Sequence, residues 1–301
     1  TASRRVFTVD SSTAAVIKDL TIQNGYTTSS SYSGGGIRNE GTLQLIDSSI
    51  HNNRASGGTG GGFYNIGDAE VLRCSFYDNT AYYGGGGVCT SADTANLILT
   101  NSTIYSNTVT AGGGAFYGGG VYISNGDATL TNNTIVYNYA RLGGGVLMYN
   151  TGEDAYFKNN IIASNDSYYG STKDFKVYGG TVNDNGYNIV GPSESFDWGQ
   201  TTGGWEDDDG DGTFELFSIG TTGTLNFDAD AAINDSPTGT LTYGVTAGSI
   251  AIDAGSTDEH NGVSIPTADQ RTASRNGNTD IGAFEYNGSL VINEPTTQAS
   301  E

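Results

Sequence analysis

The chain is poor in cysteine, histidine, methionine and proline, and it has no long hydrophobic run. Its 301 residues include 2 cysteines, 2 histidines, 1 methionine and 4 prolines. Two cysteines exclude a disulfide-dense scaffold and a multi-cysteine zinc site. No apolar run approaches the roughly 18 residues of a transmembrane helix, so we expect no membrane span.

Basic residues are also scarce. The chain has 12 Lys and Arg against 33 Asp and Glu, which gives a formal net charge of −21. Such a charge repels phosphate groups, so we expect neither nucleic acid nor an anionic membrane surface as a partner. It also disfavours polyuronate substrates unless cations bridge them.

What is abundant is glycine, with 46 residues, together with Tyr, Asn, Ser and Thr. The sequence opens at Thr1 rather than Met, as a processed mature protein would. This composition suits an extracellular β protein, and we expect a secreted protein located at the cell surface.

The sequence repeats itself. Segments 33–55, 59–81 and 117–140 each run through a glycine cluster, a short strand, a turn, a second strand and an apolar-x-x-Asn element. The steps between copies are 25 to 33 residues, and apolar residues alternate within the strands, as Leu43 and Leu45 do. This pattern favours a coil of short strands stacked about 4.8 Å apart over a helical repeat.

Equivalent positions of the repeat predict ladders along the stack. We expect the residues three positions before the repeat asparagines to form an inward apolar column (Ile50, Phe76, Ile104, Ile135 and Ile162). We expect the asparagines to stack at a corner, where Asn tolerates the left-handed conformation (Asn53, Asn79, Asn107, Asn138 and Asn165). The glycine clusters either supply positive φ at a second corner or keep a surface bare for a partner.

These repeats resemble the right-handed parallel β-helix of pectate-lyase-like proteins over roughly residues 14–191. The resemblance implies an all-β fold, a right-handed parallel β-helix (solenoid) with a less regular C-terminal β region. We divide the chain into coils at 1–191, an acidic and aromatic insertion at 192–248, a terminal segment at 249–289 and a tail at 290–301.

The insertion holds a candidate calcium loop. Residues 207–212 read DDDGDG, and carboxylates at alternate positions before a glycine turn can wrap Ca²⁺ in oxygen ligands. The candidate ligands are Asp207, Asp209, Asp211 and Glu215. Ser218 stands where an EF-hand has a bidentate Glu, so the alternatives are a calcium loop of another kind and a solvated acidic loop.

The terminal segment carries SIAIDAG at 249–255, ADQR at 268–271 and TDIGAFEY at 279–286. These motifs resemble the C-terminal signature of choice-of-anchor Q domain proteins, which implies secretion and surface display and implies no shared catalysis. The mixed charges of this segment predict either an ion-pair network that closes the last coils or a catalytic Arg/Asp site (Asp253, Asp269, Arg271, Arg275, Asp280 and Glu285).

Evidence for catalysis in the coils is weak, and whether the protein is an enzyme stays open. The basic residues of the coils occupy no common repeat position, which argues against the basic catalytic residue of a lyase (Lys18, Arg38, Arg54, Arg73, Arg141 and Lys158). Asp68, Asp127 and Asp154 lie at predicted turns. They are either ordinary turn formers or the source of the carboxylate pair of a glycosidase. Cys74 and Cys89 lie in successive coils, either as a disulfide or as buried thiols. Sequons occur at five asparagines (Asn101, Asn132, Asn165, Asn234 and Asn287).

The ends of the solenoid suggest a function. No capping helix precedes the first strands at 5–9 and 15–22, and Leu290–Asn293 is a short apolar strand before a polar tail. We therefore expect a structural or adhesive protein that associates head to tail into a filament. The alternative is a surface protein that binds or cleaves carbohydrate, with tyrosines stacking on sugar rings.

Overall fold

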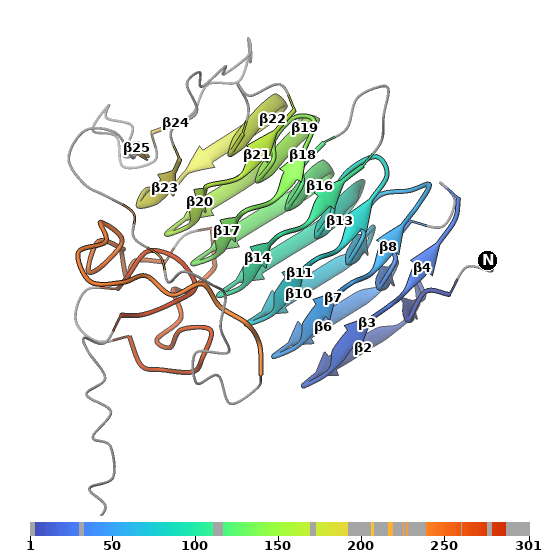
Figure 1. Cartoon of the computed structure of the whole chain (residues 1–301), viewed down its shortest axis with the longest axis horizontal. Coiled ribbons are helices and arrows are strands. Elements are labelled where there is room, and N and C mark those ends of the chain that lie inside the picture. Colours follow the sequence, from blue (N-terminus) through green and yellow to red (C-terminus); the bar gives the residue numbers. More distant parts are fainter. Residues whose placement is uncertain are drawn as a thin grey trace, which may run out of the picture.

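The computed structural model describes residues 4–29, 33–110, 117–168, 173–191, 206–207, 216–218, 225, 227, 239–259, 261–275 and 279–286. The described strands stack in parallel as successive coils, which confirms the expected all-β parallel solenoid (Figure 1). Coils 1 to 3 contain four strands each: β1 Phe7–Val9, β2 Ala14–Lys18, β3 Thr21–Gln23 and β4 Tyr26–Thr27; β5 Ile37–Asn39, β6 Thr42–Ile46, β7 Ser49–His51 and β8 Arg54–Ala55; β9 Phe63–Asn65, β10 Asp68–Leu72, β11 Ser75–Tyr77 and β12 Thr80–Ala81.

From coil 4 onward the first two strands merge into one long strand. These coils contain β13 Val88–Thr100, β14 Thr103–Tyr105 and β15 Thr108–Val109; β16 Val121–Thr131, β17 Thr134–Val136 and β18 Tyr139–Ala140; β19 Val146–Lys158, β20 Ile161–Ala163 and β21 Asp166–Ser167; β22 Phe175–Asp184 and β23 Asn188–Val190. Two further strands, β24 Glu206–Asp207 and β25 Leu216–Ser218, pair with β22 and β23. The strands form sheets of 11, 8 and 6 strands along the stack.

The predicted apolar column is confirmed. Residues Ile50, Phe76 and Ile104 pair in register on β7, β11 and β14 of the 8-stranded sheet. Ile135 and Ile162 continue the column on β17 and β20, and all five side chains are buried. Each short strand therefore contributes one inward side chain to a core that is continuous along the axis.

The asparagine ladder is also confirmed, with one correction. The Asn79 side-chain oxygen accepts hydrogen bonds from the backbone N–H and the side-chain amide of Asn53, both at 3.0 Å, and this pattern repeats at each following rung. The left-handed residue is not the asparagine, as expected, but the residue before it, for example Asn52 (φ 53°) and Tyr137 (φ 56°). The asparagine is selected for its paired donor and acceptor, because the corner is buried and every polar group there needs a partner.

A second ladder, which the sequence analysis missed, lies five residues before the first. Ser102, Asn133, Asn160 and Asn188 join successive coils by the same kind of hydrogen bond at the corner between the long strands and the 8-stranded sheet. The signal was present as a constant five-residue spacing to the first ladder (102 to 107, 133 to 138, 160 to 165).

The glycine clusters follow the first interpretation at the glycine two positions before the last one of each cluster. Gly60, Gly85 and Gly118 have φ near +60°. The later glycines of each cluster are required by close packing: a Cβ on Gly86 would lie 2.5 Å from the backbone oxygen of Gly119 in the next coil. These glycines are buried, so the clusters do not form the bare outer surface of the second interpretation.

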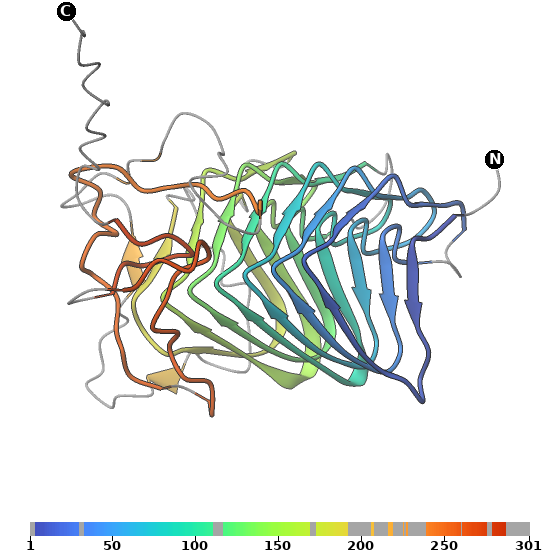
Figure 2. The same cartoon turned by 90° about the horizontal axis from the view of Figure 1, so that it is seen from below.

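The C-terminal segment lies on the side of the solenoid rather than across its last coil. Figures 1 and 2 show it, in orange and red, against the coils that carry β14, β17 and β20. Tyr243, Val245, Ala251 and Ile281 pack there on the outer faces of the 8-stranded sheet, in a second hydrophobic cluster. The segment covers the apolar outer side chains of coils 4 to 7, such as Val136, Ile161 and Ile189, so it packs against the last coils from the side.

Candidate functional site

The outer edge of coil 1 is the first candidate site. All three sheets end there, because β1, β3 and β4 are terminal strands and β2 pairs only with β6. Among the described residues, the only pairing within this coil is an antiparallel bridge between Arg4 and Tyr26. Because Tyr26 of β4 exchanges two backbone hydrogen bonds with Arg4, the edge that can act as a template for a further strand is that of β1, β2 and β3.

Coil 1 also exposes apolar side chains. Val16 on β2 is 63% exposed, and Val6 and Leu20 are exposed as well. Its inward residues are less covered than those of later coils: Ile17 retains 7% exposure, whereas Leu45 in the same column has none. An exposed end of the core with apolar neighbours is a surface that favours association.

The two ends of the chain differ in charge. Residues 1–29 contain three basic residues (Arg4, Arg5 and Lys18) and two acidic ones, whereas residues 192–248 contain eleven acidic residues and no Lys or Arg. Strands β24 and β25, the last rungs of two of the sheets, come from this acidic segment.

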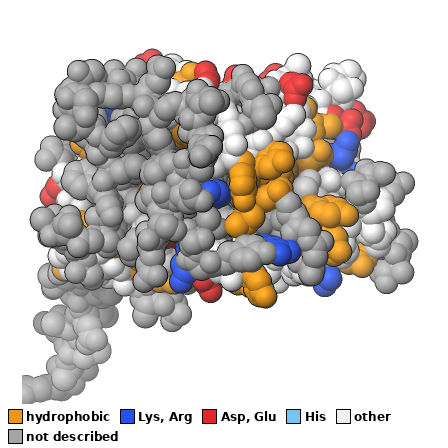
Figure 3. Space-filling model, turned by 90° about the horizontal axis from the view of Figure 1, so that it is seen from above, with side chains coloured by type: hydrophobic (Ala, Val, Ile, Leu, Met, Phe, Trp, Pro, Cys, Tyr) orange, Lys and Arg blue, Asp and Glu red, His pale blue; other side chains and the backbone are white. Residues whose placement is uncertain are grey.

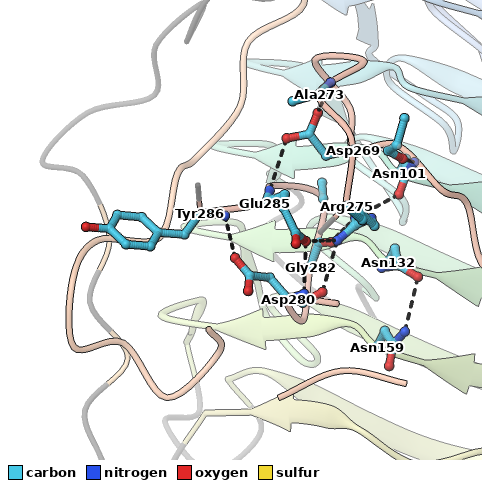
Figure 4. A network of polar contacts seen from close by, with 12 residues as sticks. Asn101, Asn132, Asn159, Asp269, Ala273, Arg275, Asp280, Gly282, Glu285 and Tyr286 are labelled. Carbon is cyan, nitrogen blue, oxygen red and sulfur yellow. Dashed lines mark hydrogen bonds and ion pairs between the residues drawn. The ribbon is translucent and has the colours of Figure 1, made fainter. Parts of the chain in front are cut away.

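The C-terminal segment holds a buried ion-pair network (Figure 4). Arg275 pairs with Glu285 at 3.0 Å, and each side chain is only 2% exposed. Arg275 also donates to the carbonyl oxygens of Asp280 and Gly282 and to the Asn101 side chain at the corner of coil 4. Burial raises the pKa of Asp280 to about 6, against the lowering effect of hydrogen bonds from the backbone N–H groups of Asp253 and Tyr286.

A second ion pair completes this network. Arg271 donates to Asp269 at 2.7 Å, and Asp269 also accepts from the backbone N–H of Glu285. The charged groups therefore bond to one another and to the turns of the segment, which favours the structural alternative over a catalytic Arg/Asp site.

Hydrogen bonds attach the C-terminal segment to corner and strand residues of coils 4 to 6. Gln270 accepts from the Thr103 hydroxyl at 2.6 Å, and the Thr134 hydroxyl accepts from the backbone of Ala283. Asn159 exchanges two hydrogen bonds with the backbone of Ser256. Sequence reasoning missed these contacts because Asn101 and Asn159 are left-handed corner residues one position before the second ladder, and no periodicity relates them to the C-terminal segment.

Tyrosines form the second candidate surface. Seven of the tyrosines that the structure describes are exposed (Tyr82, Tyr83, Tyr137, Tyr139, Tyr149, Tyr168 and Tyr178). Seen from above, hydrophobic side chains gather over the central coils beside Lys and Arg (Figure 3). Rings of Tyr117, Tyr149 and Tyr178 contact one another with centroids 5.2 to 5.9 Å apart.

The candidate catalytic residues of the coils lie in strands and not at the turns that the sequence predicted: Asp68 begins β10, and Asp127 and Asp154 lie within β16 and β19. Asp127 and Asp154 lie on neighbouring coils, where Asp127 accepts from the backbone N–H of Asp154 at 3.1 Å, while Asp68 lies two coils before Asp127. The expectation that the basic residues share no repeat position is wrong for Lys18 and Lys158, which occupy the same position of β2 and β19. They are five coils apart, however, so they do not form one site.

Both cysteines are free and buried, which selects buried thiols over a disulfide. Burial raises the pKa of each thiol to about 12, so neither is a reactive thiolate at neutral pH. Three of the sequon asparagines, Asn101, Asn132 and Asn165, are at most 4% exposed and therefore inaccessible to glycosylation in the folded protein. Asn234 and Asn287 lie outside the described residues.

The predicted calcium ligands Asp209, Asp211 and Glu215, and the apolar stretch Leu290–Asn293, lie outside the described residues. Asp207 is described in β24, where it pairs in register with Asp184 of β22. Within the ranges that the structure describes, no three His, Cys, Asp or Glu side chains form a cluster suited to a metal ion. None of the described residues forms a helix long and apolar enough to cross a membrane.

A stack of parallel coils bounded by three sheets and joined by buried side-chain ladders defines a parallel β-helix protein. The profile of the right-handed β-helix region matches residues 6–189, more than half of the chain, and the chain belongs to this family. Neither the curated proteins nor the solved structures contain a match.

Proposed function

We propose that this β-helix protein is a secreted or cell-surface structural and adhesive subunit that associates head to tail into an extracellular filament. The observation that carries the proposal is the outer edge of coil 1, where three sheets end together beside exposed Val16 and Leu20. Because one end differs from the other, the contact is heterologous, and repeated association produces an open fibre. The charge difference between residues 1–29 and 192–248 supports this orientation, and the resemblance to choice-of-anchor Q proteins supports surface display.

This function can be tested by negative-stain electron microscopy and by light scattering over a range of protein and salt concentrations. We expect fibres or oligomers whose length grows with concentration and falls with added salt, because ions screen the attraction between the ends. Val16→Glu places a charge at the contact and should prevent association, whereas Tyr83→Glu, on an exposed ring of coil 3, should not. Monodisperse particles at high concentration would contradict the proposal.

The second candidate function is carbohydrate binding or cleavage at the surface, and the contacting rings of Tyr117, Tyr149 and Tyr178 favour binding. Exposed aromatic rings offer apolar faces to sugars, and their hydroxyl groups offer hydrogen bonds. A glycan panel should then show a ligand whose affinity falls in Tyr149→Ala but not in Tyr82→Ala. Release of sugar that Asp154→Asn abolishes would instead indicate a glycosidase.

We also propose that residues 207–215 bind Ca²⁺ through Asp207, Asp209, Asp211 and Glu215. The spacing of oxygen ligands in the sequence supports this. Calorimetry of wild type and Asp209→Ala with calcium tests it: equal heats in the two proteins would contradict the assignment.

A further inference from the structure

The Arg275 guanidinium has five N–H donors, and its two terminal nitrogens are fully used. Nη1 donates to the Glu285 carboxylate and to the carbonyl oxygen of Asp280. Nη2 donates to the Asn101 side chain and to the carbonyl oxygen of Gly282. The fifth donor, Nε–H, has no acceptor among the described residues, although the side chain is only 2% exposed. Because buried donors in folded proteins are almost always paired, this N–H indicates a further acceptor.

A second buried donor lies on the rung between the contacts of Arg275. Asn101, Asn132 and Asn159 are equivalent left-handed corner residues of coils 4, 5 and 6. Arg275 bonds to Asn101 directly, and Gly282, which it also contacts, donates its backbone N–H to the carbonyl oxygen of Asn159. Asn132 lies between these two rungs, and Figure 4 shows its side chain beside Arg275. Asn132 is fully buried, and its Nδ2 has no acceptor in the part of the chain that the structure describes.

The orientation of the Asn132 amide is fixed by its neighbour on coil 6. Asn159 donates through Nδ2 to the carbonyl oxygen of Ser256 and accepts through Oδ1 from the Ser256 N–H. These bonds identify the nitrogen of the Asn159 amide, which also donates to Asn132 Oδ1 at 3.3 Å. Turning the Asn132 amide over would place two nitrogens against each other. Asn132 therefore cannot present its own oxygen to Arg275 without losing the bond from Asn159.

We infer that one water molecule binds between Arg275 Nε and Asn132 Nδ2 and accepts a hydrogen bond from each. A buried water needs two to four polar partners, and these two donors supply the first two. The Asn101 side-chain oxygen accepts from Arg275 and has a second lone pair, so it can accept a proton of the same water. The water gives the last Arg275 donor an acceptor and joins this side chain to coil 5 as well as to coil 4.

The charge of the surroundings selects neutral water over an ion. Three buried carboxylates, of Asp269, Asp280 and Glu285, accompany only two guanidinium groups, of Arg271 and Arg275. The network therefore has no positive charge to spare for an anion such as chloride, even when Asp280 is protonated. An added anion would be a buried charge without a partner, which is costly. A cation is excluded because both donors present N–H groups and no lone pair.

A crystal structure of the full chain at a resolution that shows ordered water tests the inference. We expect one peak of density within hydrogen-bond distance, about 2.7–3.2 Å, of both nitrogens. A second crystal soaked in sodium bromide distinguishes water from an anion, because bromide scatters anomalously and water does not. An anomalous peak at this position would overturn the inference. Absence of density, or a protein group that occupies the position, would overturn it as well.

Nuclear magnetic resonance tests the same site in solution. In the isotope-labelled full chain, the side-chain amide protons of Asn132 should show a cross peak to water, with the rotating-frame sign of direct cross-relaxation and not of proton exchange. Asn138 is the matched control, because it is equally buried but its Nδ2 donates to three protein acceptors. Its amide protons should show no such cross peak. Asn132→Asp removes the amide protons and should abolish the Asn132 cross peak, which verifies the assignment.

The two amides give a clear decision. A water cross peak from Asn132 alone supports the bound water, whereas a cross peak from neither amide, or from both, contradicts it. The result does not depend on filament formation, because the site lies within one subunit between the C-terminal segment and coils 4 and 5.

Discussion

Asp174 occupies a position of the asparagine ladder where an amide is expected. Its Oδ1 accepts from the backbone N–H and the side-chain amide of Asn165, both at 2.9 Å, as an asparagine oxygen does at every earlier rung. The residue is 3% exposed, and burial raises the pKa of its carboxyl from 3.8 to about 6, although the hydrogen bonds from Asn165 lower it. We predict that Asp174→Asn stabilises the protein at neutral pH.

The sign follows from proton linkage. Because the folded state binds the proton more tightly than the unfolded chain, Asp174 contributes most stability below about pH 4, and that contribution is lost as the pH rises through about 6. A shift of about 2 pKa units corresponds to about 3 kcal/mol at neutral pH, an upper bound for what the amide recovers. The melting temperature at pH 7 should rise by about 2–6 °C.

Thermal unfolding of both proteins between pH 4 and 7.5 measures the effect as a difference. The two melting temperatures should nearly coincide at pH 4 and diverge between pH 4 and 6. Asp280, whose pKa is raised similarly, is present in both proteins. Its contribution therefore cancels in the difference between the two melting temperatures. Asp68→Asn, at the exposed first residue of β10, is the control and should show no such divergence. A gap that is constant with pH, or a less stable Asp174→Asn protein, would refute the reasoning.

Three further changes probe other parts of the fold. Asn107→Ala leaves the N–H groups of Asn79 without their acceptor and should cost about 3 kcal/mol in chemical denaturation, whereas Thr108→Ala on the same corner should cost less than 1 kcal/mol. Gly86→Ala should destabilise by a similar amount, seen as a lower melting temperature, because its Cβ meets the Gly119 carbonyl oxygen. Arg275→Met leaves Glu285 buried without its cation, so amide exchange should accelerate in 249–286 and stay slow in coils 2 and 3; uniform protection would contradict this.

The repeating part of the fold could be predicted from the sequence because each rung faces the same environment. A residue that stacks on its own equivalent is selected by one local rule, so Ile50, Phe76 and Ile104 were recognisable by spacing alone. The left-handed corner residue was misplaced by one position because it varies freely: Asn52, Asp78, Ser106 and Tyr137 all adopt it. Its side chain points away from the buried ladder, so packing does not restrict its type.

The C-terminal segment could not be placed in the same way. Its charged residues predicted an ion-pair network as one of two alternatives, but the attachment to Asn101, Thr103 and Thr134 depends on contacts between residues more than 140 positions apart. No periodicity relates the two sides of that interface. One feature of the sequence indicated this interface. The outward position of the 8-stranded sheet changes from Gln23 and His51 to Val136 and Ala163, so the outer face of the sheet becomes apolar in the later coils.

A repeat of this kind also limits where specific function arises. The backbone and side-chain hydrogen bonds of every interior rung are satisfied by the two neighbouring rungs. The repeat pattern itself therefore does not determine where the stack ends. Distinct properties must therefore come from the segments that depart from the repeat: coil 1 with its exposed Val16, the acidic residues 192–248, and the segment from 249 onward.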